Sequence, residues 1–174
     1  MLRESLREYL LVAEWCVRYQ KDVSWGADQV GGRLGYPAAV MLFCIADTIG
    51  SFHRGDRHFT APVGGRSLSI RRQGSQHFYV LNSDYYGQSL SEATIKRLYA
   101  NFRDLLVHNA ALAPEHALVS RPDLRAAFPI ADDRQLVNID GLLAITKPAL
   151  ARFLERVPTL VPASQQEDNI RKKR

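Results

Sequence analysis

The spacing of apolar and polar residues predicts a chain made mostly of helices. Four segments carry apolar residues at steps of three and four positions, the periodicity of helices packed on a core. They span residues 2–21, 37–52, 90–113 and 141–157. The second begins with Pro37, which suits a first helical turn, and its first half is apolar on every side, so we expect it at the centre of the core.

The third segment, residues 90–113, carries the main polar cluster of the chain. Ser89 or Ser91 can cap its start, and Pro114 cannot continue it. At about 100° per residue, one side of the expected helix is apolar. The residues on that side are Ile95, Leu98, Phe102, Leu105, Leu106 and Leu112.

The segments between the helices are expected to be irregular or to form small β elements. Residues 22–35 contain four glycines and read as a connection. An irregular or small β insertion is expected at about 53–88, with strand character at 67–71 and 76–81 around a turn at Gly74. A short hairpin is expected within about 118–139, from 128–131 and 135–139. The predicted fold is an all-α bundle of four to five helices with these insertions.

Length and composition favour one intracellular domain. The chain has 174 residues, and we expect a single domain over 1–157 followed by a disordered basic tail at 158–174. Cys16 and Cys44 each fall in an apolar helical pattern, which favours buried thiols over a disulfide framework. The charged N-terminus lacks the apolar core of a signal peptide, and no apolar run reaches the ~20 residues of a membrane span. A cytoplasmic, soluble protein without a membrane partner is expected.

A net charge of +5 and a pI near 9.4 favour an anionic partner such as RNA. Cations and aromatic rings alternate through 53–88, which suggests that phosphates meet the cations while bases stack on the rings. The predicted RNA-binding residues are Arg54, Arg57, Arg71 and Arg72. A solvated loop anchored by its aromatic side chains is the alternative. His53 and His58 lack neighbouring ligands at a recognisable spacing, so no metal or cofactor is expected.

Three polar residues of the segment 90–113 are predicted to form a ridge. Asn101, Asp104 and His108 lie within about 60° of one another on a regular α-helix. Arg103 lies about 140° from His108, but its long side chain can still reach the same cleft, especially where two copies of the helix meet.

The letters Arg103-Asp104-Leu105-Leu106-Val107-His108 resemble the motif of HEPN domains, an Arg followed by a polar residue and then by a His. Those are small all-α domains, commonly dimeric. Many are metal-independent ribonucleases, and others only bind nucleotides or partners. The resemblance implies that Arg103 and His108 are the catalytic pair, that Asp104 is the intervening polar residue, and that the protein is a homodimer. It also implies a possible antitoxin partner, since HEPN toxins often have one.

In this hypothesis His108 transfers protons, Arg103 stabilises the charged phosphorane, and Asp104 or Asn109 orients the imidazole. Asn101 and Asp47 are supporting residues. The structural alternative is that Arg103 pairs with Asp47 as a contact between helices, while Asp104 and His108 form an ordinary surface pair of ~0.3 kcal/mol. The functional alternative is a non-catalytic domain that binds nucleotide, RNA or protein.

Overall fold

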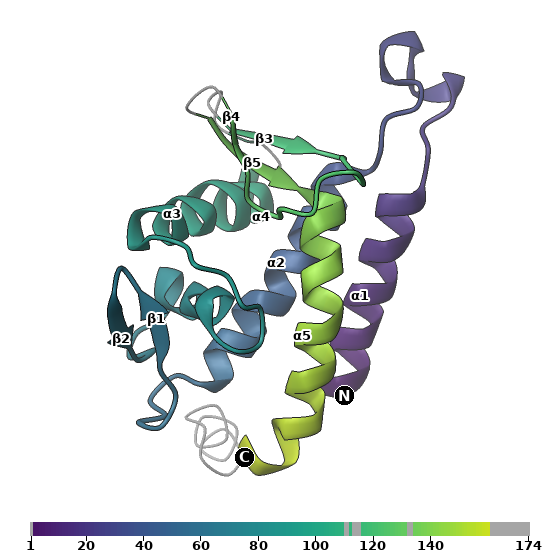
Figure 1. Ribbon diagram of the computed structural model, residues 1–174. Coiled ribbons are helices and arrows are strands. Elements are labelled where there is room, and N and C mark those ends of the chain that lie inside the picture. The colour runs from purple at the N-terminus through teal and green to yellow at the C-terminus, as the bar shows by residue number, and fades with distance from the viewer. Residues whose placement is uncertain (1, 110–111, 113–115, 132–133, 161–174) are drawn as a thin grey trace. The chain divides into compact units, whose positions relative to one another are not determined.

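The computed structural model describes residues 2–109, 112, 116–131 and 134–160, which are mostly helical and include two small sheets (Figure 1). The chain forms two compact units, one from residues 1–43 and 101–145 and the other from 44–100 and 146–174. The structure is compatible with the predicted helical bundle carrying a small β insertion. The all-α class is not exact, because the second predicted β region belongs to a three-stranded sheet.

The first unit begins with α1 (Leu2–Arg18), whose core side carries Leu6, Ala13, Cys16 and Val17. The helix ends three residues earlier than predicted. Nη1 of Arg33 donates to the carbonyl oxygen of Arg18 at 2.8 Å, so a cation covers the C-terminal end of the helix, where carbonyl groups lack helical partners. Residues 19–34 then project beyond α1 as the expected connection, with two short 3-10 turns, η1 (Val23–Trp25) and η2 (Ala27–Gln29) (Figure 1).

The sheet of the first unit contains β3 (His116–Val119), β5 (Arg134–Asn138) and β4 (Ile130–Ala131), in that order. The antiparallel pair of β4 and β5 confirms the predicted hairpin, whose turn at 132–133 lies outside the described residues. The parallel strand β3 was not predicted. Asn138 is fully buried, and its Nδ2 donates to the carbonyl oxygens of Arg121 and Leu124 at 3.0 and 2.8 Å, which fixes the loop leading to β4.

Two long helices belong partly to each unit. The first is α2 (Gly35–Phe52), which contains Pro37 in its first turn as predicted and is buried along most of its length. The second is α5 (Ile139–Leu160), which is longer than the predicted 141–157 and continues through Pro148 and Pro158. The last helical turn therefore includes the start of the predicted tail, and the rest of that tail, 161–174, lies outside the described residues.

The hairpin of the insertion in the second unit lies earlier in the sequence than predicted. Its hairpin pairs β1 (Ala61–Val63) with β2 (Arg66–Leu68) across Gly64 and Gly65. Both glycines have positive φ angles, of 57° and 76°, as a two-residue hairpin turn of type I′ requires. The predicted strand at 67–71 is confirmed only at residues 67–68, which lie in β2, and the predicted strand at 76–81 is wrong. Residues of the second one form the 3-10 helix η3 (Gly74–Asn82), against which β1 and α3 (Glu92–Arg97) both pack.

Burial on all sides explains why the strand assignment failed for η3. Phe78, Val80 and Leu81 are fully buried, and so is Tyr79 apart from 4% of its surface. A continuous apolar run has the same pattern in a buried strand and in a buried helical segment. Asn82 ends η3 and joins the neighbouring segments, because its Nδ2 donates to the carbonyl oxygens of Pro62 and Leu90 at 2.7 and 2.8 Å.

The composition of α2 is also that of a helix able to cross a membrane. Its 18 residues have a mean hydropathy of 1.3, and 56% of them are buried inside the structure. A buried core helix of a soluble protein satisfies the same criteria. The structure is thus compatible with a soluble protein.

The close approach of α2 to η3 predicts a strong effect of one added methyl group. A Cβ at Gly50 would lie 2.1 Å from the carbonyl oxygen of His77, and a backbone atom cannot move aside cheaply. We expect Gly50→Ala to lower the free energy of unfolding by about 3 kcal/mol in urea titrations. Gly35→Ala in the same helix is the control, because its Cβ would lie 3.7 Å from Leu118, an ordinary contact. Equal stability of the two variants would contradict this packing.

Candidate functional site

The helix that carries the predicted site is not uniform. Ser91 caps α3 as predicted, because its Oγ accepts from the Thr94 amide at 3.1 Å. The chain then widens into the π-helix η4 (Leu98–Asp104) and returns to an α-helix in α4 (Leu105–Asn109). The predicted single α-helix is therefore wrong over 98–104. The predicted core side is largely confirmed, since Ile95, Leu98, Phe102 and Leu106 are buried, while Leu105 and Leu112 are half-buried.

Asp104 lies between the two residues predicted to be catalytic. Its Oδ1 is 3.4 Å from Nη1 of Arg103 and 3.5 Å from Nε2 of His108. The Arg103 side chain is 23% exposed and that of His108 is 66% exposed. The structure thus brings together an arginine side chain that is largely covered, a carboxylate and an imidazole open to solvent. We call these three residues the Arg-Asp-His cluster.

Asn101 has turned away from the predicted ridge. Its Nδ2 lies 2.9 Å from Nε2 of His116, a buried residue of β3. The π-helix explains the difference, because its i→i+5 turn advances each residue by less than the α-helical angle and so separates Asn101 from Asp104. Asn109 is the last residue of α4, and its side chain lies outside the described part of the chain. The supporting roles of both asparagines stay predictions.

Asp47 has a partner that the sequence did not reveal. Its Oδ1 lies 2.8 Å from Nδ1 of His77, which is 7% exposed and belongs to η3 in the same unit. A carboxylate on a core helix needs such a partner, as expected from the cost of burying an unpaired charge. The 30-residue separation gave no local pattern from which to find it. Asp47 and Arg103 belong to different units, and their predicted pairing stays a prediction.

The predicted RNA-binding arginines are partly gathered at one surface pocket of the second unit. Arg57, Arg71 and Arg72 are exposed, and Arg54 is half-buried. A pocket of about 510 Å³ is lined by Gly55, Asp56, Arg57, Ser69, Ile70 and Arg71. The Gly55 amide donates to the carbonyl oxygen of Ile70 at 2.9 Å, so its two walls are joined by the backbone.

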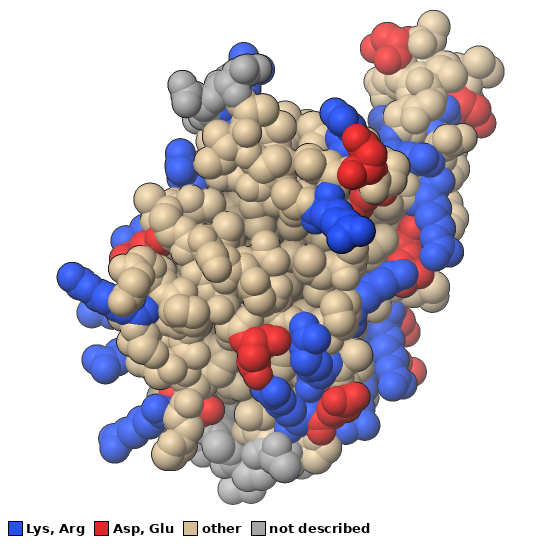
Figure 2. Space-filling model, viewed as in Figure 1, with Lys and Arg blue, Asp and Glu red and all other residues tan. Residues whose placement is uncertain are grey.

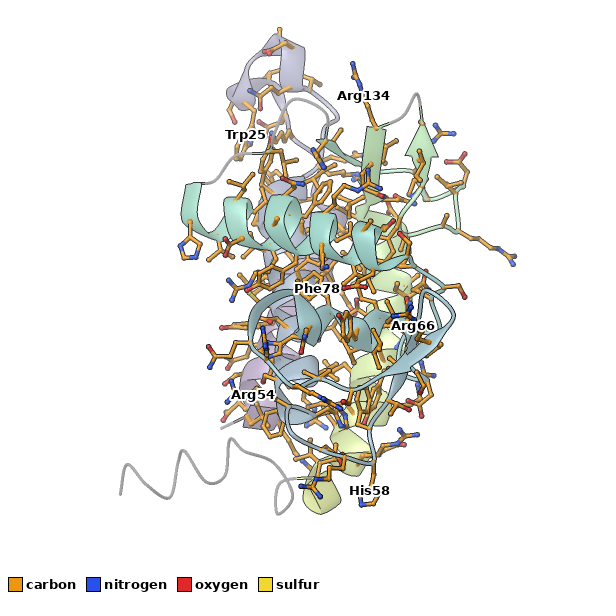
Figure 3. The ribbon with its side chains drawn as sticks, turned by 90° about the vertical axis from the view of Figure 1, so that its left-hand side faces the viewer. Trp25, Arg54, His58, Arg66, Phe78 and Arg134 are labelled. Carbon is orange, nitrogen blue, oxygen red and sulfur yellow. The ribbon has the colours of Figure 1, made fainter. Side chains whose placement is uncertain are left out.

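Most of the aromatic rings of this region cannot stack on bases. Phe78 and Tyr85 are fully buried and Tyr86 is 5% exposed, and Figure 3 shows Phe78 in the interior while His58 and Arg66 lie at the surface. The predicted aromatic stacking surface is therefore wrong for these three rings. The alternative, a loop anchored by its aromatic side chains, describes them, because burial of large apolar rings stabilises the fold more than exposure would.

The comparisons with known proteins add no relative. No family model, curated protein or solved structure gives a significant match to the chain. Over the described part of the chain, no group of three or more His, Cys, Asp or Glu side chains is placed to hold a metal ion. The fold and the Arg-Asp-His cluster therefore define a mostly helical protein with a polar, solvent-open candidate site.

His53 is a structural histidine whose ionisation should couple to stability. Its ring stacks on Phe59 at a centroid distance of 3.9 Å, and its Nε2 lies 3.2 Å from the Tyr85 hydroxyl. Burial lowers the pKa of His53 to about 4, although Asp56, 3.7 Å from Nδ1, opposes the shift. The residue is thus neutral near pH 7, which makes it unsuitable as an RNA-binding cation.

The lowered pKa of His53 predicts a loss of stability in mild acid. Below its ordinary pKa of ~6.5 the unfolded chain binds a proton that the folded protein excludes until about pH 4, so the free energy of unfolding falls as pH decreases through this window. We expect a slope of roughly 1 kcal/mol per pH unit, measured by urea unfolding between these limits. His53→Gln should flatten the slope, while the exposed control His58→Gln should not. An unchanged slope in His53→Gln would contradict the assignment.

Proposed function

We propose that the protein is a HEPN-like, metal-independent endoribonuclease of the cytoplasm that acts as a homodimer and serves as a toxin or in defence. The proposal is supported above all by the position of Asp104, whose Oδ1 is within 3.5 Å of both Arg103 and His108. It also draws on the resemblance of residues 103–108 to the HEPN motif and on the basic charge of the chain.

The cluster supplies the groups that RNA cleavage needs. One base takes the proton of the 2′-hydroxyl, whose oxygen then attacks the adjacent phosphorus. The bond to the 5′-oxygen breaks, and an acid returns a proton to that leaving oxygen, which leaves a 2′,3′-cyclic phosphate. Imidazole can serve as base or acid near neutral pH, and guanidinium can hold two oxygens of the charged phosphorane.

In this proposal the three side chains share these tasks. Nε2 of His108 faces Asp104, so in this proposal Nδ1 is the nitrogen that exchanges protons with RNA, and Asp104 orients the ring. Arg103 contacts the same carboxylate and can exchange part of that interaction for a phosphate. One imidazole cannot serve both sides of the phosphorus, so the second copy of the chain supplies the other.

The catalytic role of the cluster is tested by cleavage of labelled RNA in the presence of a chelator. We expect His108→Ala and Arg103→Ala each to lower the cleavage rate ~10²-fold or more, because general acid-base catalysis and charge stabilisation contribute ~10²–10⁴ each. Arg125→Ala is the matched control, since Arg125 is exposed in the same unit and lies outside the cluster. Circular dichroism checks that all variants are folded. If both cluster variants are folded and still cleave RNA, the proposal is contradicted.

The alternative, a non-catalytic domain that binds RNA, nucleotide or protein, is favoured by the pocket between Arg57 and Arg71. Its volume of about 510 Å³ is within the range of small-ligand sites, and two guanidinium groups suit phosphate oxygens. A protein partner such as an antitoxin is a further part of the proposal, and it depends on the HEPN resemblance alone.

RNA binding by this pocket predicts a specific salt dependence. We expect the double variant Arg57→Ala/Arg71→Ala to weaken binding of a single-stranded RNA and to reduce the slope of log K against log salt by about 1.4, since each phosphate contact contributes about 0.7 for single strands. Arg134→Ala is the control, because Arg134 projects from β5 in the other unit (Figure 3). Fluorescence anisotropy measures both quantities, and equal slopes in all proteins would exclude the pocket.

A further inference from the structure

Helix α1 has a second apolar face, which is exposed and lies opposite its core side. Leu6, Ala13 and Val17 face the core, whereas Trp15 lies about 160–180° around the axis from them. Trp15 is 58% exposed, and Leu11 and Val12 are 67% and 44% exposed. Apolar side chains grouped in this way on a helix surface mark a contact with another molecule more often than a solvated face.

The exposed face continues into the connection that follows α1. The ring centroids of Trp15 and Tyr19 are 5.1 Å apart, and those of Tyr19 and Trp25 are 6.3 Å apart. Nε1 of Trp25 donates to the Tyr19 hydroxyl at 3.2 Å, so the row of rings is held in place before any partner arrives. Lys21 lies over the Trp25 ring at 4.8 Å, which gives this end of the face a positive charge. We call the residues Leu11, Val12, Trp15, Tyr19 and Trp25 the aromatic face.

The N-terminal half of α1 carries a groove. A hollow of about 450 Å³ is lined by Arg3, Glu4, Arg7, Glu8 and Leu11. Both signs of charge are present, and Figure 2 shows acidic and basic side chains interspersed along α1. One end of the helix therefore carries the exposed indole of Trp15, while the other carries a charged hollow that Leu11 borders.

We propose that a second copy of the chain docks on this face, with the two α1 helices antiparallel about a two-fold axis near Leu11 and Val12. In that arrangement position i meets position 23 − i of the second copy, so Trp15 of each copy enters the groove at Glu8 of the other. The indole can then lie over the Arg7 guanidinium, and its N–H can donate to the Glu8 carboxylate.

A second copy suits the face better than an unrelated partner because the face is complementary to itself. A two-fold interface requires each protruding group and its receiving hollow to occur on the same surface, as Trp15 and the groove do here. The exposed parts of Leu11, Val12 and Trp15 in each copy contribute apolar area toward the ~800 Å² per partner that a stable interface needs.

The inference goes beyond the proposed function, because the aromatic face lies on α1 and the segment after it, whereas the Arg-Asp-His cluster lies on η4 and α4. The face itself is a property of α1 and the segment after it. Association and RNA cleavage can therefore be measured separately in the same proteins.

Sedimentation velocity of the full chain over the micromolar range tests the interface. We expect a dimer whose dissociation constant rises ~30-fold or more in Trp15→Glu and in Leu11→Lys, as for residues at the centre of an interface. Ile130→Lys is the matched control, because Ile130 is an apolar residue 65% exposed on β4, away from α1. A wild-type protein that stays monomeric would overturn the proposal, and so would a dimer that these two variants leave intact.

A crosslink tests the antiparallel geometry. In a Cys44→Ser background, Val12→Cys should form a disulfide between copies, since only positions close to the two-fold axis bring Cα atoms of identical residues within ~7 Å. Val23→Cys, at a position 81% exposed, is the control that should not form it. Crosslinking in neither or in both variants would overturn the arrangement.

The outcomes for association and for cleavage are distinguishable. A dimer that does not cleave RNA would remove the proposed function and leave this interface in place. Cleavage at the wild-type rate by a monomeric Trp15→Glu variant would contradict the two-copy mechanism. It would not contradict the interface. Association with another protein in the absence of self-association would count against the second copy as occupant.

Discussion

The candidate site depends on the widened turn of the π-helix, residues 98–104. Two side chains of the cluster are at its end, and a π-turn persists only where packing and hydrogen bonds compensate for its less favourable geometry. Phe102 supplies packing, since it is fully buried. Its ring centroid lies 6.2 Å from that of Phe43 and 5.3 Å from that of His116. Asn101 adds the bond to His116. The turn is thus anchored on its inner side, while Asp104 at its end keeps half of its side chain exposed.

The predicted helices were right where one local rule was sufficient. Ser91 caps α3, Pro37 lies in the first turn of α2, and the apolar positions of residues 95–106 are mostly buried, because capping and helical periodicity depend on neighbours in sequence. The β insertion was misplaced where two turn signals competed. Gly64-Gly65 makes the hairpin, whereas Gly74 begins η3, and only the packing of that helix against α3 and β1 decides between them.

The cluster could be predicted because its three members lie within six residues, and the pair of Asp104 with His108 follows from a step of four on a helix. Other contacts could not be predicted because their partners are remote in sequence. His77 is 30 residues from Asp47, and Asn138 is 17 residues from the loop that it fixes. A sequence shows that Asn, Asp or His is present, but burial decides whether it is a partner within the fold or a group offered to a ligand.

That distinction separates the five histidines, all of which lie in the described residues. His53, His77 and His116 are buried, and each has a polar side chain within 3.2 Å of a ring nitrogen. His58 is exposed, but the nearby Asp56 carboxylate accepts from its backbone amide at 2.8 Å. His108 combines an exposed ring with a carboxylate that also contacts an arginine. Since a proton-transfer group must reach its substrate and yet be oriented, this combination favours position 108 over the other four.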